Sequence, residues 1–227
     1  MKTAIAIDGP SGAGKSTISK LLAKELGFTY VDTGAIYRTV GVFVHRNGID
    51  PKSAEAVSSV LDKINIEIKH IGGQQKLYLN GEDVTVAIRE HIISEYASAV
   101  SAIPAVRAFL LDMQRAFAER DNVIMDGRDI GTVVLPDAEI KIFLTATDED
   151  RARRRYEELA ARGQNVPFET VLSDMRARDA RDSARAVAPL VAADDAILVD
   201  TTGNTLEKSV KVIREIVSAR LGELKNV

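Results

Sequence analysis

The chain has 227 residues, which is enough for one large α/β domain that carries small inserted subdomains. Its 30 lysines and arginines stand against 33 acidic residues, and the formal charge of −3 gives no electrostatic reason to expect nucleic acid or an anionic membrane as a partner. The absence of cysteine excludes disulfides, thiolate catalysis and cysteine-ligated zinc.

The N-terminal stretch reaches the acidic Asp8 after too few apolar residues to be a secretory signal. No apolar run in the sequence is as long as a membrane span. We therefore expect a cytoplasmic protein that acts on a small substrate, with no membrane and no nucleic acid as partner.

A glycine-rich loop follows the first predicted strand, which contains Ile5 and Ile7. The loop fits the pattern Gly-x4-Gly-Lys-Ser, and the amphipathic helix that follows has Gly27 where a helix C-cap is expected. Glycines let the backbone direct several N–H groups at one phosphate, and the start of the helix adds the positive end of its dipole. Because strand, loop and helix occur in register, we prefer a phosphate-binding loop to a glycine-rich turn that matches by chance.

Each polar residue of this loop has a chemical reason to be there. Lys15 can reach the β- and γ-phosphates of a nucleoside triphosphate, and the hydroxyl of Ser16 can ligate the Mg²⁺ that bridges them. A bulky side chain in place of Gly14 would block the approach of the phosphate. We predict that a nucleoside triphosphate binds along the loop, which consists of Gly9, Pro10, Ser11, Gly12, Ala13, Gly14, Lys15, Ser16 and Thr17.

A second buried strand is predicted over residues 28–32, and a helix that starts at Thr33 follows it. Ligands gather at the carboxyl ends of strands in a parallel sheet, so Asp32, Thr33 and Arg38 are placed to meet a second substrate. The alternative is a helix cap followed by a solvated arginine.

The pattern then changes from helical to alternating. A short helix over residues 53–61 is followed by alternating apolar residues at Ile64, Ile66 and Ile68, and Asn80-Gly81 is a strong hairpin-turn signal. We predict a small antiparallel unit here. Helical character resumes over residues 88–102.

Pro104 suits the first turn of the next helix, which has an apolar stripe of Val106, Leu110, Met113 and Phe117. Arg107 lies near the start of that helix, where it could either meet an anion or remain a surface arginine.

The strand predicted over residues 122–126 ends in Asp126, which is the acidic residue expected to hold Mg²⁺ together with Ser16. The next residues are Gly127, Arg128 and Asp129. Gly127 allows a ligand to approach the backbone, while Arg128 and Asp129 could recognise an anionic and a polar group of one small molecule.

A buried strand over residues 140–144 precedes two arginine-rich helices joined at Gly163, which we predict to form a helical hairpin. Interleaved acidic residues are typical of a solvated face, but a phosphoryl-transfer enzyme needs cations and a lid that excludes water. Arg178, Arg181 and Arg185 are three and four residues apart, so we expect them to share one helix face. A last strand over 195–200 and a helix over 205–221 complete the chain.

Two weaker signals point elsewhere and are set aside. Asp200-Thr201-Thr202-Gly203 matches the Asp-x-x-Gly switch of GTPases, but it lies near the end of the chain and no guanine-reading motif accompanies it. The three histidines, His45, His70 and His91, have no spacing typical of paired metal ligands.

Several motifs together resemble bacterial cytidylate kinases, and the resemblance runs along essentially the whole chain. They are the loop Asp8–Thr17, Asp32-Thr33-Gly34-Ala35-Ile36-Tyr37-Arg38, Asp126-Gly127-Arg128-Asp129-Ile130-Gly131-Thr132-Val133-Val134, Arg178-Asp179-x-Arg181-Asp182 and Arg185-Ala186-x-Ala188-Pro189-Leu190. The antiparallel unit at 64–84 looks like the extra segment of the longer bacterial form.

The resemblance implies an α/β fold with a three-layer P-loop NTPase core, a central parallel sheet, a small antiparallel insert and a helical lid. One domain would span 1–227, with a core (1–61, 101–150, 183–227), an insert that binds the nucleoside monophosphate (62–100) and a lid (151–182). The expected reaction is transfer of phosphate from ATP to CMP or dCMP with Mg²⁺, by a monomer.

The resemblance also assigns roles to residues. Phosphoryl transfer needs alignment and charge neutralisation more than a strong base, so we name no general base. The residues expected to be catalytic are Lys15, Arg128, Arg178 and Arg181. Those expected to face CMP are Thr33, Arg38, Ser98, Arg107, Arg128, Asp129, Arg178, Asp182 and Arg185. Among them, Ser98, Asp129, Asp182 and Arg185 would address base or sugar, and Arg38, Arg107 and Arg128 the phosphate and nearby polar atoms.

Two other functions remain open from the residues. One is a P-loop kinase for a different small acceptor, such as another nucleoside monophosphate. The other is a nucleotide-operated switch, which would hydrolyse ATP slowly without an acceptor.

Overall fold

The computed structural model describes residues 2–161 and 163–225. The chain forms two compact units: one consists of Met1–Thr29 and Asp121–Val227, and the other of Tyr30–Arg120. The predicted insert at 62–100 falls within the second unit, and the predicted lid at 151–182 falls within the first. The functional division into core, insert and lid stays a prediction.

The central sheet is parallel and is built on strand β1 (Ala4–Asp8), all of whose residues are buried. The strand order is β2-β6-β1-β7-β8, where β2 is Thr29–Asp32, β6 is Val123–Asp126, β7 is Ile140–Thr145 and β8 is Ile197–Asp200. The nearly continuous apolar runs of β1, β6 and β7 are those of strands covered on both faces. Ile7 pairs with Asp126 in the register, so β1 and β6 end at the same edge.

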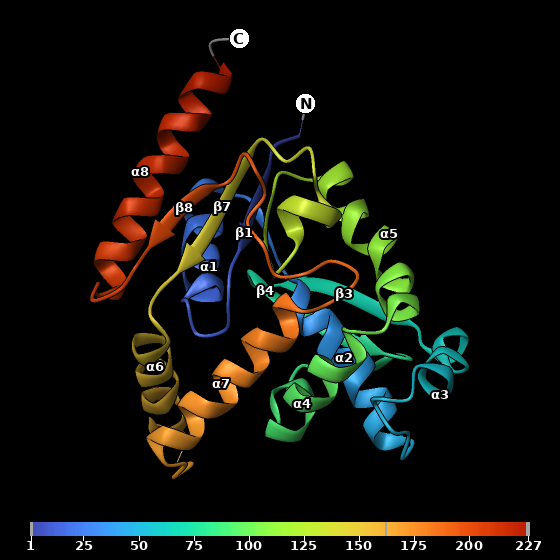
Figure 1. Cartoon of the computed structure of the whole chain (residues 1–227). Coiled ribbons are helices and arrows are strands. Elements are labelled where there is room, and N and C mark those ends of the chain that lie inside the picture. The colour runs from blue at the N-terminus through green and yellow to red at the C-terminus, as the bar shows by residue number, and fades with distance from the viewer. Residues whose placement is uncertain (1, 162, 226–227) are drawn as a thin grey trace. The chain divides into compact units, whose positions relative to one another are not determined.

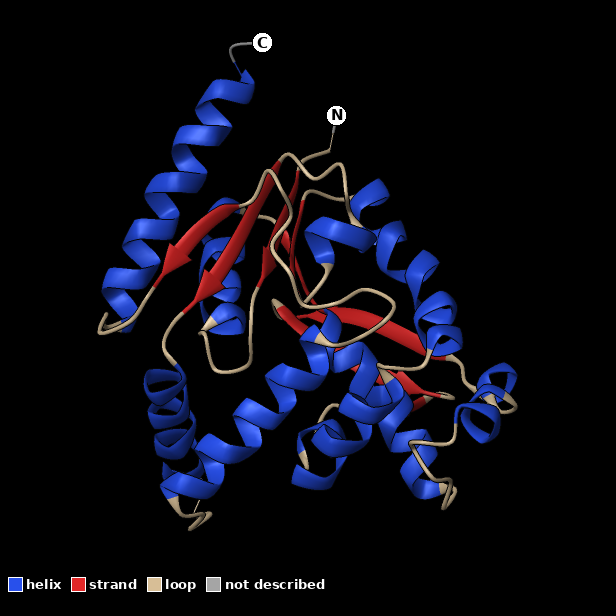
Figure 2. Ribbon diagram, viewed as in Figure 1, coloured by secondary structure: helices blue, strands red, loops and turns tan. Residues whose placement is uncertain are grey.

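Within the first unit, helices lie beside the strands of the sheet, as Figures 1 and 2 show. In the first unit, α1 (Lys15–Leu26) packs against α8 (Leu206–Lys225). Gly27 caps α1 in the left-handed conformation, as predicted from the sequence. A π-helical turn over Ile130–Val134 follows β6, and no sequence signal indicated it.

The predicted helical hairpin is confirmed as α6 (Asp148–Ala161) and α7 (Phe168–Ser183). The buried apolar stripes of the two helices pack together into a small core of their own, and the charged faces of both helices point away from it. This core consists of Ala152, Leu159, Val171, Leu172 and Met175, with Val166 and Phe168 packed against it.

The second unit combines α2 (Thr33–Arg46), α3 (Ala54–Ser58), α4 (His91–Val100) and α5 (Pro104–Arg120) with a three-stranded antiparallel sheet. The strands are β3 (Ile66–Ile71), β4 (Gln74–Leu79) and β5 (Glu82–Asp83). The predicted hairpin turn is confirmed, because Asn80 and Gly81 both have positive φ, at 50° and 86°.

Helices α2 and α4 pack closely at Gly41, where a Cβ would lie 3.2 Å from the Ala97 nitrogen.

Among the described residues no single helix is long and apolar enough to cross a membrane. Helices α4 and α5 meet that criterion only as a pair, bent by 100°.

Three predicted boundaries were wrong. The helix predicted over 88–102 is interrupted at Glu90, whose extended backbone (φ −62°, ψ 145°) separates a 3₁₀ turn at Ala87–Arg89 from α4. The helix predicted over 53–61 ends at Ser58. Helix α8 continues to Lys225, beyond the predicted end at 221.

Candidate active site

The loop after β1 has the geometry that the glycine pattern predicts, and space is tightest at its first glycine. A Cβ on Gly9 would lie 1.9 Å from the carbonyl oxygen of Leu144 in β7, so only glycine fits. At Gly14 a Cβ would meet only Ile18 within the chain, at 3.6 Å, and the φ of +88° by itself disfavours a side chain there. Within the described residues no side chain caps the start of α1. The N–H groups of Lys15, Ser16 and Thr17 in its first turn therefore suit an anion.

Lys15 is buried and lies across this loop. Its ammonium group donates a hydrogen bond to the carbonyl of Pro10 at 2.6 Å. Burial, together with the positive charge of Arg128, holds the pKa of Lys15 well below that of an exposed lysine, although Asp126 and Asp8 act in the opposite direction. A bound polyphosphate would add negative charge beside the ammonium group and favour its protonated form.

Ser16 and Asp126 lie together, as the sequence predicted for the metal site. The Ser16 hydroxyl donates to Oδ2 of Asp126 at 2.7 Å, and Asp126 is 4% exposed at the end of β6. A hydroxyl and a carboxylate beside the phosphate loop are oxygen ligands of the kind that Mg²⁺ prefers. The donor set therefore fits this ion.

Asp8 joins the phosphate loop to the turn after β6, a connection that the sequence analysis did not anticipate. Its Oδ1 accepts from the Ile130 N–H at 2.8 Å, and its Oδ2 accepts from the Gly131 N–H at 2.7 Å. Burial raises the pKa of Asp8 to about 6, partly offset by these two hydrogen bonds. This carboxylate therefore fixes the turn that carries Arg128 and the buried Asp129.

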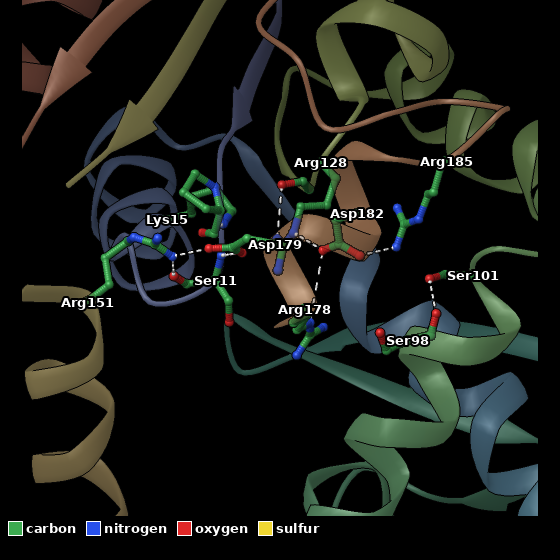
Figure 3. Close-up of polar contacts among 12 residues, drawn as sticks. Ser11, Lys15, Ser98, Ser101, Arg128, Arg151, Arg178, Asp179, Asp182 and Arg185 are labelled. Carbon is green, nitrogen blue, oxygen red and sulfur yellow. Dashed lines mark hydrogen bonds and ion pairs between the residues drawn. The ribbon is translucent and has the colours of Figure 1, made fainter. Parts of the chain in front are cut away.

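Three arginines surround a single buried carboxylate in this unit, a group that we call the arginine cluster: Arg128, Arg178, Asp182 and Arg185 (Figure 3). Asp182 Oδ2 lies 3.1 Å from Nε of Arg128 and 4.0 Å from Nε of Arg178, while its Oδ1 accepts from Arg185. Burial by itself would raise the pKa of Asp182, but Arg128, Arg185 and Arg178 together outweigh it and lower the pKa. The cluster holds more positive than negative charge and suits an anion.

The expectation that Arg178, Arg181 and Arg185 share one helix face was wrong. Helix α7 ends at Ser183, so Arg185 belongs to the segment that follows it. Arg178 and Arg185 converge on Asp182, whereas Arg181 is exposed. A catalytic role for Arg181 stays a prediction that this geometry does not favour.

The helical hairpin contacts the phosphate loop through Arg151 and Asp179, both of which the sequence analysis missed as site residues. Arg151 Nη1 donates to the Ser11 carbonyl at 2.8 Å and to Asp179 Oδ2 at 2.5 Å. Asp179 Oδ1 lies 3.4 Å from the Ser11 nitrogen. Arg151 and Asp179 thus bond the backbone carbonyl and the backbone N–H of Ser11, respectively (Figure 3). Arg151 looked like part of a solvated arginine run, yet its side chain is only 4% exposed.

In the second unit, Asp32 organises the start of α2. Its Oδ1 caps the helix by accepting from the Ala35 N–H at 2.8 Å, and its Oδ2 accepts from Arg38 Nη2 at 3.0 Å. The cap is therefore Asp32 rather than Thr33, which is the first helical residue and is buried. Arg38 is held beside the helix start instead of being freely solvated.

Arg107 is buried at the start of α5, which excludes the surface-arginine alternative. Its Nη1 donates to the Ser101 carbonyl at 3.2 Å, and its guanidinium carbon lies 5.5 Å from the centre of the Tyr37 ring. The Ser101 hydroxyl in turn donates to the Ser98 carbonyl at 2.9 Å (Figure 3). Ser98 and Arg107 are thus joined through Ser101.

The predicted residues therefore fall into two local groups. The first unit holds the phosphate loop, Asp126, Asp129 and the arginine cluster. The second unit holds Thr33 and Arg38 at the start of α2, and Ser98 and Arg107 on α4 and α5. The residues that sequence reasoning missed are Asp8, Arg151 and Asp179, whose weak signals are an acid at a strand end and two charges in mixed-charge helices.

Comparison with known proteins gives one consistent family. The family model described as cytidylate kinase matches residues 5–219. The cytidylate kinase of Caldicellulosiruptor saccharolyticus is 50% identical over 97% of this chain and 98% of its own. That of Carboxydothermus hydrogenoformans is 49% identical over 95% and 97%, and that of Streptococcus pyogenes is 48% identical over 93% and 94%.

One solved structure supports the fold alone. It is an uncharacterized protein from Eubacterium ventriosum with 14% identity, which covers 96% of this chain and 99% of its own with a TM-score of 0.54. The family itself is shown by the sequence relatives, which match nearly their full lengths. With a phosphate loop, a buried lysine and a family model over almost all of its residues, this chain belongs to the cytidylate kinase family.

Proposed function

We propose that this chain transfers the γ-phosphoryl group of ATP to CMP and dCMP, giving ADP with CDP or dCDP. The family assignment makes it a nucleoside-monophosphate kinase that uses ATP and small nucleotide substrates. The observation that carries the proposal is the pairing of a phosphate loop with a separate arginine cluster in one unit. Two anionic substrates need two cationic sites.

On the donor side, the residues that would hold ATP are those of the loop from Gly9 to Thr17. The backbone N–H groups at the start of α1 bind the phosphates, and the Lys15 ammonium group moves from the Pro10 carbonyl to the phosphate oxygens. Phosphoryl transfer depends on alignment and charge neutralisation more than on a strong base, so no general base is assigned. Arg178 and Arg128 neutralise charge that develops on the transferred group.

On the acceptor side, residues are assigned to CMP one by one, from their places in the family motifs. Arg38, Arg107 and Arg128 bind its phosphate, and Thr33 supports them at the start of α2. Ser98, Asp129, Asp182 and Arg185 address the base or sugar. Because both oxygens of Asp182 already accept from arginines, we assign it chiefly to orienting those arginines.

Mg²⁺ would be held by Ser16 and Asp126, whose side-chain oxygens are already at hydrogen-bond distance. When bound there, the ion neutralises charge on the β- and γ-phosphates. A monomer located in the cytoplasm stays the prediction made from the sequence, and sedimentation of the purified chain tests the oligomeric part.

The direct test measures ADP release with ATP and Mg²⁺ as CMP, dCMP, UMP and AMP are offered separately. Strong turnover of CMP and dCMP, with little of UMP and none of AMP, is the expected result. Equal or better turnover of AMP or UMP would contradict the acceptor assignment. Slow hydrolysis without response to any acceptor would favour a nucleotide-operated switch.

A further inference from the structure

The outer strand of the central sheet has backbone groups that a neighbouring strand would normally satisfy. Strand β2 stands at the end of the strand order, next to β6 alone. The Thr29 N–H donates to the Asn122 carbonyl at 2.8 Å, which places the backbone groups of residue 29 on the β6 side. Successive residues of a strand alternate in direction, so those of Tyr30 and Asp32 face the open edge.

Two side chains of the antiparallel sheet occupy these open positions. The amide of Gln75 bonds both backbone groups of Asp32: its Oε1 accepts from the Asp32 N–H at 2.8 Å, and its Nε2 donates to the Asp32 carbonyl at 3.2 Å. Nε2 of His70 lies 2.8 Å from the Tyr30 carbonyl, and because a carbonyl only accepts, this nitrogen carries the proton. The side chains thus replace a missing strand at the edge.

The register shows that this arrangement is built into the β3–β4 hairpin. Ile66 pairs with Leu79, Ile68 with Leu77 and His70 with Gln75. Residues two apart on a strand share a face, so His70 and Gln75 continue the same face as these apolar pairs. Polar residues occupy the positions on that face that bond to β2.

The bonded backbone groups belong to Asp32, the residue that precedes α2. Asp32 uses its backbone for Gln75 and its side chain for the helix cap and for Arg38. Any shift of this backbone would move the Arg38 guanidinium and the first helical residue, Thr33. These are two of the residues assigned to CMP.

We propose that Gln75, assisted by His70, is a positioning residue for the acceptor: it fixes the Asp32 backbone and thereby the places of Arg38 and Thr33. This inference rests on the proposed function, because it presumes that Arg38 binds the CMP phosphate. It gives the antiparallel insert a defined part in acceptor binding. Gln75 itself does not touch the nucleotide in this account.

The test uses steady-state kinetics on the full chain with CMP and ATP varied separately. Gln75→Ala is expected to raise the KM for CMP about 5- to 10-fold and to leave the KM for ATP within about 2-fold, since one or two neutral hydrogen bonds are lost. His70→Ala removes one hydrogen bond, made by an exposed side chain, and we expect the KM for CMP to rise about 2-fold. Gln74→Ala is the matched control, because Gln74 is the exposed neighbour on the same strand.

A second variant separates hydrogen bonding from packing. Gln75→Glu keeps the shape but replaces the donor by an acceptor that faces the Asp32 carbonyl, so it should raise the KM for CMP at least as much as Gln75→Ala. A Gln75→Glu enzyme with unchanged KM for CMP would overturn the inference. Amide hydrogen exchange supplies a readout without catalysis: the Asp32 N–H should exchange about 10-fold faster in Gln75→Ala than in Gln74→Ala, and equal rates would overturn the inference.

Arg38→Ala distinguishes this inference from the function on which it rests. It should raise the KM for CMP more than either Gln75 variant does. If Arg38→Ala leaves that KM unchanged, the assignment of Arg38 to CMP fails, and this inference fails with it. If Arg38→Ala raises the KM while both Gln75 variants leave it unchanged, only the role of Gln75 is overturned.

Discussion

The phosphate loop and the arginine cluster both prepare one unit of this kinase for anions, but they are built in different ways. The loop is one continuous stretch in which backbone N–H groups and a single buried lysine provide the positive potential. The cluster joins a turn after β6 to the end of α7, and one carboxylate, Asp182, holds its three arginines. Substitutions other than those to proline leave the backbone donors of the loop in place, whereas the three arginines of the cluster share the carboxylate of a single side chain.

The largest effect is expected at the one side chain on which the loop depends. Lys15→Met should lower kcat by about 10³-fold, because a charge-stabilising donor is lost while the backbone donors remain. ADP release at saturating ATP and CMP measures it. Lys24→Met, on the exposed face of the same helix, is the control and should keep full activity. A small loss in Lys15→Met would mean that the backbone alone provides the loop's function.

Asp182→Asn tests the dependence of the cluster on one carboxylate. The substitution keeps the shape but removes the negative charge that the three arginines share, so kcat/KM for CMP should fall about 10²-fold and the free energy of unfolding by about 2–4 kcal/mol. Kinetics and urea denaturation measure the two effects. The exposed Asp174 of the same helix gives the control Asp174→Asn. If both variants behave alike, the arginines are held by other contacts.

Asp8 lies where the two regions meet, and its pKa predicts a pH dependence of stability. The pKa of about 6 in the folded chain exceeds the ordinary value of 3.8, so the folded state binds more protons between these values and its stability falls as pH rises through them. Relative to Asp8→Asn, the natural chain should therefore gain about 1 kcal/mol on going from pH 7 to pH 5. Urea denaturation at both pH values measures the difference. A constant difference would contradict the raised pKa.

The smallest effect is expected where arginines are solvated. Arg176 pairs with Asp148 and Glu149 on the outer face of the hairpin. Arg176→Ala should change neither kcat nor the KM for CMP. It should move Tm by no more than about one degree, because exposed ion pairs contribute little to the free energy of unfolding. Thermal unfolding checks this. A marked loss of activity would extend the functional surface beyond the cluster.

The contrast between a continuous loop and a cluster assembled from distant segments also explains what could be predicted from the sequence. The loop, Lys15, and the Ser16–Asp126 pair followed from a local motif and from strands that end at one edge. The arginine cluster could not be derived from spacing, because Arg128 and Asp182 are 54 residues apart and meet only through the fold. Helical periodicity treated Arg178 and Arg181 alike, and only the packing of α7 separates them.

A second feature that the sequence could not predict is a buried charged side chain within a segment rich in charged residues. Arg151 stands in a segment rich in arginines and acids, where composition indicates a solvated face. Its burial depends on the approach of α7 and of the loop, which no local pattern records. In the antiparallel insert, the hairpin turn at Asn80-Gly81 was predictable, but the contacts of His70 and Gln75 with β2 were not.

The contact between the phosphate loop and the helical hairpin limits how this sequence can vary. A Cβ on Gly12 would lie 2.7 Å from the terminal methyl group of Met175 and 3.0 Å from the Arg151 carbonyl. A shorter residue at position 175 would relieve the first clash, but the second involves backbone and requires α6 to shift. The φ of +73° would strain a side chain at position 12 even then, so glycine is required there both by the backbone conformation and by the closeness of the hairpin.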